Sequence, residues 1–173
     1  MSNRFHGCLV QVNDTGVLIG GASGVGKSET TLELIERGHS FISDDQVCLS
    51  LDNGRLKGEA PEAIRGLIEI RGLGILSIPD LYGERCCLAG SVIDLAIHIE
   101  PGDDPRKFER VGFSRKEKEF FGISIPTIVF PGKTVASLAT LIEVAVRDHV
   151  NRLRGTVPIR KSSRRFRSKA LVQ

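Results

Sequence analysis

The stretch Gly20-Gly21-Ala22-Ser23-Gly24-Val25-Gly26-Lys27-Ser28 decides how this sequence is interpreted. From Gly21 onward it satisfies the pattern G-x-x-x-x-G-K-[ST] in full. Glycines here let backbone N–H groups approach phosphate oxygens, and a helix starting near Lys27 directs its positive dipole end at the same anion. The Lys27 ammonium suits the β- and γ-phosphates, and the Ser28 hydroxyl suits Mg²⁺. The stretch therefore predicts a nucleotide-phosphate site formed by Gly21, Ala22, Ser23, Gly24, Val25, Gly26, Lys27 and Ser28.

The residues on either side of this loop have the patterns of a strand and a helix. Residues 9–12 and 17–19 are short apolar segments around Asn13-Asp14-Thr15-Gly16, which predicts a hairpin. Residues 27–37 are good helix formers, and Gly38 stands where a helix commonly ends. A phosphate loop between a strand and a helix is the arrangement that its mechanism requires, which argues against a plain glycine-rich turn.

The rest of the sequence predicts a mixed α/β fold in which strands outnumber helices. Residues 55–90, rich in glycine and proline, indicate irregular structure, and the highly charged residues 100–118 indicate an exposed loop. The longest helical pattern, with an apolar stripe, runs from 134 to about 153. Further strands are expected at 40–43, 46–51, 92–99 and 127–130.

Composition narrows the class of protein. The 173 residues are 40% hydrophobic and 26% charged, as in an ordinary globular domain. No apolar run is long enough for a membrane-spanning helix, and the first residues lack the apolar region of a secretory signal. The four cysteines, at 8, 48, 86 and 87, have no CxxC spacing and suit neither a disulfide framework nor a zinc site. We therefore expect a soluble, cytoplasmic protein with reduced thiols and no membrane association.

The charge is unevenly distributed. The whole chain has a net charge of +3, yet from Arg154 onward there are seven Lys and Arg residues and no acid, so residues 1–153 are mildly acidic. We expect one domain over 1–153, which contains the phosphate loop, and a flexible basic tail over 154–173. Such a tail can contact nucleic acid or another anionic surface, but no aromatic series accompanies the charge, which favours a solvated terminus and argues against a nucleic-acid partner.

The pair Asp44-Asp45 follows the expected strand at 40–43. In-line phosphoryl transfer needs a carboxylate on the metal side and a group that orients the nucleophile, in addition to a phosphate loop. If this strand is parallel to its neighbour, the pair and the loop lie at the same edge of the sheet. Neighbouring side chains on an extended backbone point to opposite sides, so at most one carboxylate faces the γ-phosphate while the other serves the metal or the scaffold. The alternative is an exposed acidic turn.

Several further blocks occur in order along the chain. They are His6-Gly7, Glu33-Leu34-Ile35-Glu36-Arg37-Gly38-His39, Glu69-Ile70-Arg71-Gly72-Leu73-Gly74-Ile75, Phe108-Glu109-Arg110-Val111-Gly112 and Pro131-Gly132-Lys133. With the phosphate loop and Asp44-Asp45, they resemble the catalytic C-terminal domain of the HPr kinase/phosphorylase (HPr serine kinase) family over about residues 5–150. The resemblance implies an α/β fold: a P-loop-containing mixed β-sheet with few helices, of the HPr kinase/PEP carboxykinase-like type.

The resemblance also implies an activity. Members phosphorylate a serine of HPr, a phosphocarrier protein of the sugar phosphotransferase system, with ATP and Mg²⁺. They also remove that phosphate with inorganic phosphate as nucleophile, releasing pyrophosphate. An ATP-dependent serine kinase that acts on an HPr-like protein is therefore expected. The resemblance also implies the reverse, phosphorolytic activity and assembly as the family's homo-hexamer.

Roles for individual residues come from the same resemblance. Asp45 matches the residue that takes the proton from the substrate serine, and an Arg at position 110 suits the charge that spreads over the transferred phosphoryl oxygens. Without the family, His6 is a solvated or capping histidine, Glu69 belongs to a surface charge pair and Arg110 lies in a solvated run. The resemblance assigns catalytic roles to His6, Lys27, Asp45 and Arg110, and metal contacts to Ser28 and Glu69.

The chain also departs from the family's pattern. Typical members carry an additional N-terminal domain, whereas His6 lies almost at the start here, so we expect the catalytic domain alone. Lys133 and Thr134 stand where Arg and Asn are common, which leaves the phosphorylase direction open, because a Lys cannot reproduce the Arg fork. Two alternatives are a small-molecule P-loop kinase and a non-catalytic, nucleotide-responsive regulator that signals through its tail.

Overall fold

The computed structural model describes residues 4–102, 115–134 and 136–156. Within these residues the largest sheet has six strands, in the order β11 (Arg115–Phe120), β12 (Ile123–Pro131), β10 (Leu95–Glu100), β3 (Thr15–Gly21), β2 (Cys8–Val12) and β4 (Ser40–Ser43). A four-stranded antiparallel sheet consists of β1 (Arg4–His6), β5 (Gln46–Asp52), β6 (Arg55–Glu59) and β9 (Gly90–Val92), and a separate hairpin of β7 (Leu67–Ile70) and β8 (Gly74–Ser77). The helices are α1 (Lys27–Glu36), α2 (Ile78–Tyr82) and α3 (Leu138–Leu153), with short 3₁₀ turns η1 (Glu62–Ile64) and η2 (Glu84–Cys86). The fold is therefore the expected mixed α/β architecture with few helices.

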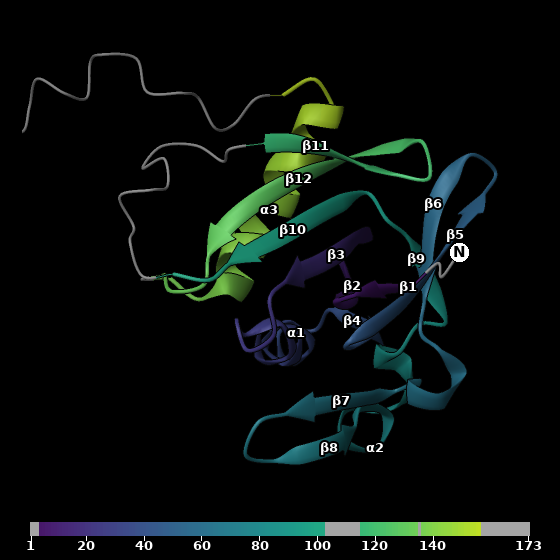
Figure 1. Cartoon of the computed structure of the whole chain (residues 1–173), viewed down its shortest axis with the longest axis vertical. Coiled ribbons are helices and arrows are strands. Elements are labelled where there is room, and N and C mark those ends of the chain that lie inside the picture. The colour runs from purple at the N-terminus through teal and green to yellow at the C-terminus, as the bar shows by residue number, and fades with distance from the viewer. Residues whose placement is uncertain (1–3, 103–114, 135, 157–173) are drawn as a thin grey trace, which may run out of the picture.

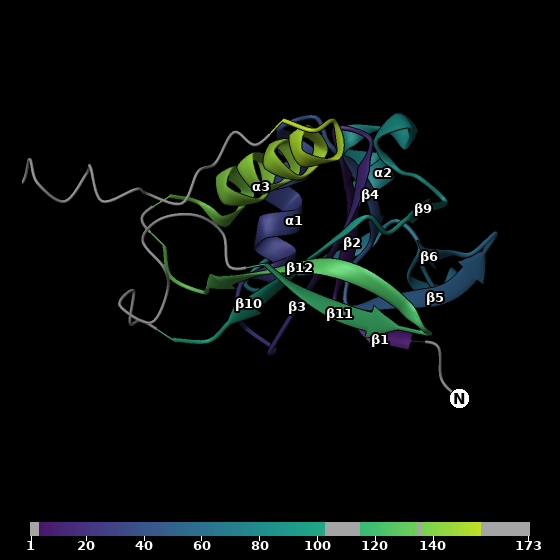
Figure 2. The ribbon, with the colours of Figure 1, turned by 90° about the horizontal axis from the view of Figure 1, so that it is seen from above.

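The six-stranded sheet separates two hydrophobic cores. Helices α1 and α3 cover one of its faces (Figure 2) and contribute Leu34, Ile142 and Val146 to the first core. On the other face, Leu9 and Leu18 pack against residues of β5 and β6, so the smaller sheet covers part of that face. Because side chains alternate between the two faces of a strand, β2 and β3 supply both cores and are almost wholly buried.

The β7–β8 hairpin lies below α1 and β4 (Figure 1). Ile68 and Ile70 on its inner face pack with Ile35 of α1 and Phe41 of β4 in a third, small core. The hairpin is thereby attached to α1, which follows the glycine-rich loop, and to β4, which precedes the Asp44-Asp45 pair.

The elements around the glycine-rich loop confirm the sequence prediction. Asn13 and Asp14 adopt positive φ angles of 46° and 63° in the turn between β2 and β3, as a two-residue hairpin turn requires. Helix α1 ends with Arg37 as its C-cap and Gly38 at φ +90°. Gly38 donates its N–H to the Ile35 carbonyl (2.9 Å), which satisfies a carbonyl of the last helical turn.

Other segments differ from the expectation. Residues 55–90 were expected to be irregular, but they contain β6, β7, β8 and α2. The sequence did not reveal these strands because strands of four or five residues are too short to show a periodic pattern. The single strand expected at 92–99 is two strands in different sheets, since the chain crosses between them at Ile93 and Asp94. Strand β11 occupies part of the expected charged loop, and its alternating Lys and Glu side chains suit the edge of a sheet. Helix α3 starts at Leu138 rather than at 134, because the Ser137 hydroxyl caps it.

No helix among the described residues is long and apolar enough to cross a membrane.

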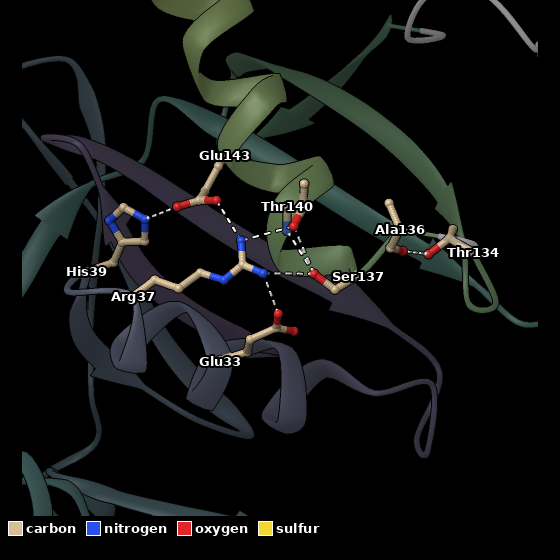
Figure 3. A network of polar contacts seen from close by, with 8 residues as sticks. All are labelled: Glu33, Arg37, His39, Thr134, Ala136, Ser137, Thr140 and Glu143. Carbon is tan, nitrogen blue, oxygen red and sulfur yellow. Dashed lines mark hydrogen bonds and ion pairs between the residues drawn. The ribbon is translucent and has the colours of Figure 1, made fainter.

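A polar network joins the end of α1 to the start of α3 (Figure 3). The Arg37 guanidinium donates to Glu33 (2.5 Å), to Glu143 (2.7 Å) and to the hydroxyl groups of Ser137 and Thr140 (3.1 and 3.0 Å). His39 Nε2 lies 2.9 Å from the other oxygen of Glu143. Burial alone would raise the pKa of Glu143, but hydrogen bonds from His39 and Arg37 outweigh it and hold this pKa below its ordinary value. The network thus holds the ionised carboxylate between the two helices.

This network predicts a pH-dependent contribution to stability. A carboxyl group with a lowered pKa in the folded state stabilises the fold above its unfolded-state pKa of about 4.5, and that stability is lost as the pH falls through the folded-state pKa. Replacing Glu143→Gln should lower the melting temperature by about 3 °C at neutral pH, and the difference from the wild type should shrink in acid. Thermal unfolding followed by circular dichroism at several pH values measures it. The exposed Glu62→Gln is the control, and an equal loss at all pH values would contradict the ion-pair explanation.

Candidate functional site

The glycine-rich loop connects β3 to α1 in a conformation that other residues adopt with difficulty. Gly24 and Gly26 have φ angles of +78° and +94°, in the left-handed region that favours glycine. At Gly21 a Cβ atom would lie 2.4 Å from the Ile99 carbonyl oxygen, so only glycine fits beside β10. The glycine spacing of the motif therefore follows from the backbone path of the loop.

The loop is suited to an anion. Lys27 is buried, and its ammonium donates to the carbonyls of Gly21 (3.1 Å) and Ala22 (2.9 Å) across the loop. Within the described residues, no amide from 22 to 26 donates to a main-chain carbonyl, and the first that does so is Thr30 N to Gly26 O (3.0 Å). The amides of the loop, the lysine and the positive end of α1 are the components of a phosphate cradle.

Asp44 is the central buried acid of the site, with only 3% of its surface exposed. Its Oδ1 accepts hydrogen bonds from the Ser28 hydroxyl (2.8 Å) and the Cys8 thiol (2.9 Å). Its Oδ2 accepts the Glu69 backbone N–H (3.1 Å). One carboxylate thus connects α1, β2 and β7. Burial, followed by the charge of Asp44, raises the pKa of the Cys8 thiol, so Cys8 is a neutral donor.

Asp45 lines the same cavity as Asp44 but is mostly exposed. It has a positive φ of 63°, which is uncommon for a non-glycine residue but tolerated by Asp and Asn. The Gly7 amide donates to its carbonyl (2.9 Å), and its Oδ1 lies 3.2 Å from His6 Nδ1. The side chain is 61% exposed, so this carboxylate can meet an incoming group directly.

The edge of the sheet brings these acids close to the loop, but the strand that precedes them is paired differently from the expectation. Strand β4 pairs antiparallel with β2, not with a parallel neighbour. Because β2 is itself antiparallel to β3, β4 runs in the same direction as β3. Asp44-Asp45 and the glycine-rich loop therefore follow strand ends at the same edge, as the sequence analysis required.

These residues line one cavity of about 360 Å³. The β7–β8 hairpin forms its lower wall, with Glu69 on β7 and Arg71 in the turn. The Arg71 guanidinium reaches over the loop, since a Cβ at Gly24 would lie 3.7 Å from its Nη2. The described lining residues are His6, Ser23, Gly24, Gly26, Lys27, Ser28, Glu29, Asp44, Asp45, Glu69, Ile70, Arg71, Gly72 and Gly74.

The cavity contains most of the residues that the sequence singled out. His6, Lys27, Ser28, Asp45 and Glu69 all line it. Three residues of the motif, Gly21, Ala22 and Val25, are outside the lining, and Val25 packs against the first core. Arg110 lies outside the described residues.

The sequence did not single out Cys8 and Arg71 for this site. Residue spacing left the roles of Asp44 and Asp45 open, and only the family resemblance assigned the proton acceptor to Asp45. A thiol in a hydrophobic strand has no pattern that distinguishes it from a core residue, and only folding shows that Cys8 contacts Asp44. Arg71 belongs to the block 69–75, and the position of this block among the other family-like blocks was the only sequence feature that linked Arg71 to the site.

The cavity combines an anion cradle with an exposed carboxylate, which suits the transfer of a phosphoryl group to or from a hydroxyl. Among the described residues, no three His, Cys, Asp or Glu side chains are arranged to hold a metal ion on their own. Mg²⁺ commonly binds with one or two protein oxygens plus phosphates and water, and Ser28 beside Asp44 offers that kind of donor set.

Comparison with known proteins shows the family to which the chain is related. The model of the HPr Serine kinase C-terminal domain matches residues 1–166. Proteins named HPr kinase/phosphorylase from Caldicellulosiruptor bescii and Lactiplantibacillus plantarum are 46% and 44% identical to the chain, over 83% of its length in each case. These alignments cover 47% and 46% of the relatives, so the chain spans about half the length of the curated relatives it matches.

A solved structure, that of the Hpr(Ser) kinase/phosphatase from Coxiella burnetii, is similar over nearly its whole length. The TM-score is 0.80 at 32% identity, covering 88% of this chain and 93% of the other. The matched family model, the relatives and the shared fold together show that the chain belongs to the HPr serine kinase C-terminal domain family.

Proposed function

We propose that this chain is an ATP-dependent protein kinase that phosphorylates a serine of an HPr-like phosphocarrier protein. The observation that carries the proposal is the placement of the exposed Asp45 carboxylate in the same cavity as Lys27 and Ser28 of the phosphate loop. The names of the relatives, HPr kinase/phosphorylase, support the choice of HPr as acceptor. We also propose that the protein is cytoplasmic and forms a homo-oligomer. Its basic tail, from residue 154 onward, is proposed to be separate from the catalytic domain.

The phosphate end of ATP is assigned to the loop. The loop amides and the Lys27 ammonium bind the phosphate oxygens and offset the charge that develops during transfer. Ser28 and Asp44 are the protein oxygens suited to Mg²⁺, with Glu69 as the second metal contact implied by the family. Bound Mg²⁺ supplies charge neutralisation at the β- and γ-phosphates.

Asp45 receives the proton from the acceptor serine. The serine oxygen attacks the γ-phosphorus of ATP, and the bond between that phosphorus and the ADP oxygen breaks. The serine proton passes to the Asp45 carboxylate. His6, 3.2 Å from Asp45 Oδ1, orients that carboxylate. In the reverse direction, an oxygen of inorganic phosphate attacks the phosphorus of phosphoserine and the bond from that phosphorus to the serine oxygen breaks. Pyrophosphate forms, and Asp45 returns the proton to the serine oxygen. Arg110 is assigned to the charge on the transferred group.

The division of roles predicts different losses in two variants. Lys27→Ala should weaken ATP binding and reduce transfer by about a hundredfold, because it removes the cation of the cradle. Asp45→Asn should leave ATP affinity unchanged and reduce kcat by a factor of about 10² to 10⁴, because Asn keeps the left-handed backbone but accepts no proton. Calorimetric titration with Mg-ATP and transfer of radiolabelled phosphate to HPr measure the two effects. Transfer by Asp45→Asn at the wild-type rate would refute the base role.

The contact between Cys8 and Asp44 predicts a further effect. In Cys8→Val the buried Asp44 carboxylate loses a hydrogen-bond donor, which should cost about 1–3 kcal/mol of unfolding free energy and raise the Mg²⁺ concentration needed for half-maximal transfer. Cys8→Ser retains a donor and should restore the Mg²⁺ dependence. Urea unfolding and Mg²⁺ titration of the transfer rate provide the two readings. An unaltered Mg²⁺ dependence in Cys8→Val would limit Cys8 to a packing role.

A further inference from the structure

Two large apolar side chains stand exposed beside the opening of the site. Leu73 lies in the turn of the β7–β8 hairpin and is 69% exposed, and Ile75 on β8 is 70% exposed. Single exposed hydrophobic residues are common on protein surfaces, but adjacent ones at the opening of a functional cavity often mark a contact with another protein.

The two faces of the hairpin explain this exposure. Ile68 and Ile70 of β7 point inward and are buried against α1 and β4. Because side chains alternate, Glu69 lies on the outer face, and Ile75 is its direct cross-strand partner in the antiparallel register. Their Cβ atoms are therefore about 5 Å apart. The inward face stabilises the fold, whereas Ile75 on the outer face has no comparable burial.

The outer face continues into the cavity. Glu69, Arg71, Gly72 and Gly74 of the hairpin line the cavity that also contains Asp45. In Figure 1 the turn of the hairpin lies on the same side of the molecule as the loop between β3 and α1. The hairpin tip therefore lies beside the cavity that contains Asp45.

From this geometry we propose that Leu73 and Ile75, the docking rim, form an apolar contact with the protein that presents the acceptor serine. The inference rests on the proposed function. A specific protein–protein contact covers about 800 Å² on each partner, which corresponds to a disc with a radius of about 16 Å. Ile75 stands one strand spacing from Glu69 in the cavity wall, so a folded acceptor centred on Asp45 covers the docking rim. Nucleotide in the phosphate loop does not require the rim.

The chemistry of the rim indicates the matching surface. Leucine and isoleucine offer no hydrogen bonds, so the acceptor contributes apolar side chains next to its serine. The charged residues of the cavity then act on the serine itself, while the rim holds the surrounding surface. The rim thus discriminates a folded acceptor protein from free serine or another small hydroxyl compound.

The test is a double variant, Leu73→Gln with Ile75→Thr, which keeps a β-branched residue in β8 and changes side chains that are exposed in the free protein. The matched control is Leu51→Gln, at an exposed leucine (51%) near the β5–β6 turn. Steady-state transfer to purified HPr gives kcat and KM, calorimetry gives the affinities for Mg-ATP and for HPr, and thermal unfolding checks the fold.

The double variant should raise the KM for HPr and weaken HPr binding about tenfold, equivalent to about 1.4 kcal/mol, with unchanged kcat, ATP affinity and melting temperature. The control should match the wild type in every measurement. Transfer by the double variant with an unaltered KM, or an equal rise in the control, would overturn the docking rim alone. If the wild type neither binds nor phosphorylates HPr, the proposed function fails, and the docking rim fails with it.

Discussion

The buried carboxylate of Asp44 is the contact on which the rest of the site depends. A carboxylate removed from water is unfavourable unless donors surround it, and here the Ser28 hydroxyl, the Cys8 thiol and the Glu69 amide supply them. These donors come from α1, β2 and β7, three elements far apart in the sequence. Satisfying one charge therefore fixes the phosphate loop, the central sheet and the hairpin wall relative to one another.

The adjacent residue has the opposite environment, and this contrast divides the work of the site. Asp45 is 61% exposed on a left-handed backbone, whereas Asp44 is 3% exposed within the fold. Two neighbouring carboxylates of the same chemical type thereby acquire different surroundings, one beside the hydroxyl of the phosphate loop and one at the opening next to His6. The unusual backbone at Asp45 is held by the Gly7 amide, so β1 and β2 also position this side chain.

The sequence predicted local features that depend on short-range chemistry. The glycine-rich loop, the hairpin turn at Asn13-Asp14 and the end of α1 at Gly38 were all recognisable, because a positive φ or a free N–H at a helix start restricts the residue type within a few positions. The prediction of irregular structure over residues 55–90 was wrong. Strands such as β7 and β8 have four residues each, and their pairing with one another and packing on Ile35 and Phe41, rather than any periodicity, define them.

By itself, the sequence determined that a phosphate loop stands between a strand and a helix, with acidic residues after a later strand, and that the ordered blocks resemble one kinase family. Only the tertiary structure decided which of Asp44 and Asp45 is buried, that β4 runs in the same direction as β3 although its partner is antiparallel, and that Cys8 and Arg71 lie at the site. The physical reason is that backbone conformation depends on near neighbours in the chain. The environment of a charged side chain depends instead on residues brought together across the sheet and the hairpin, and a linear pattern carries no record of those distances.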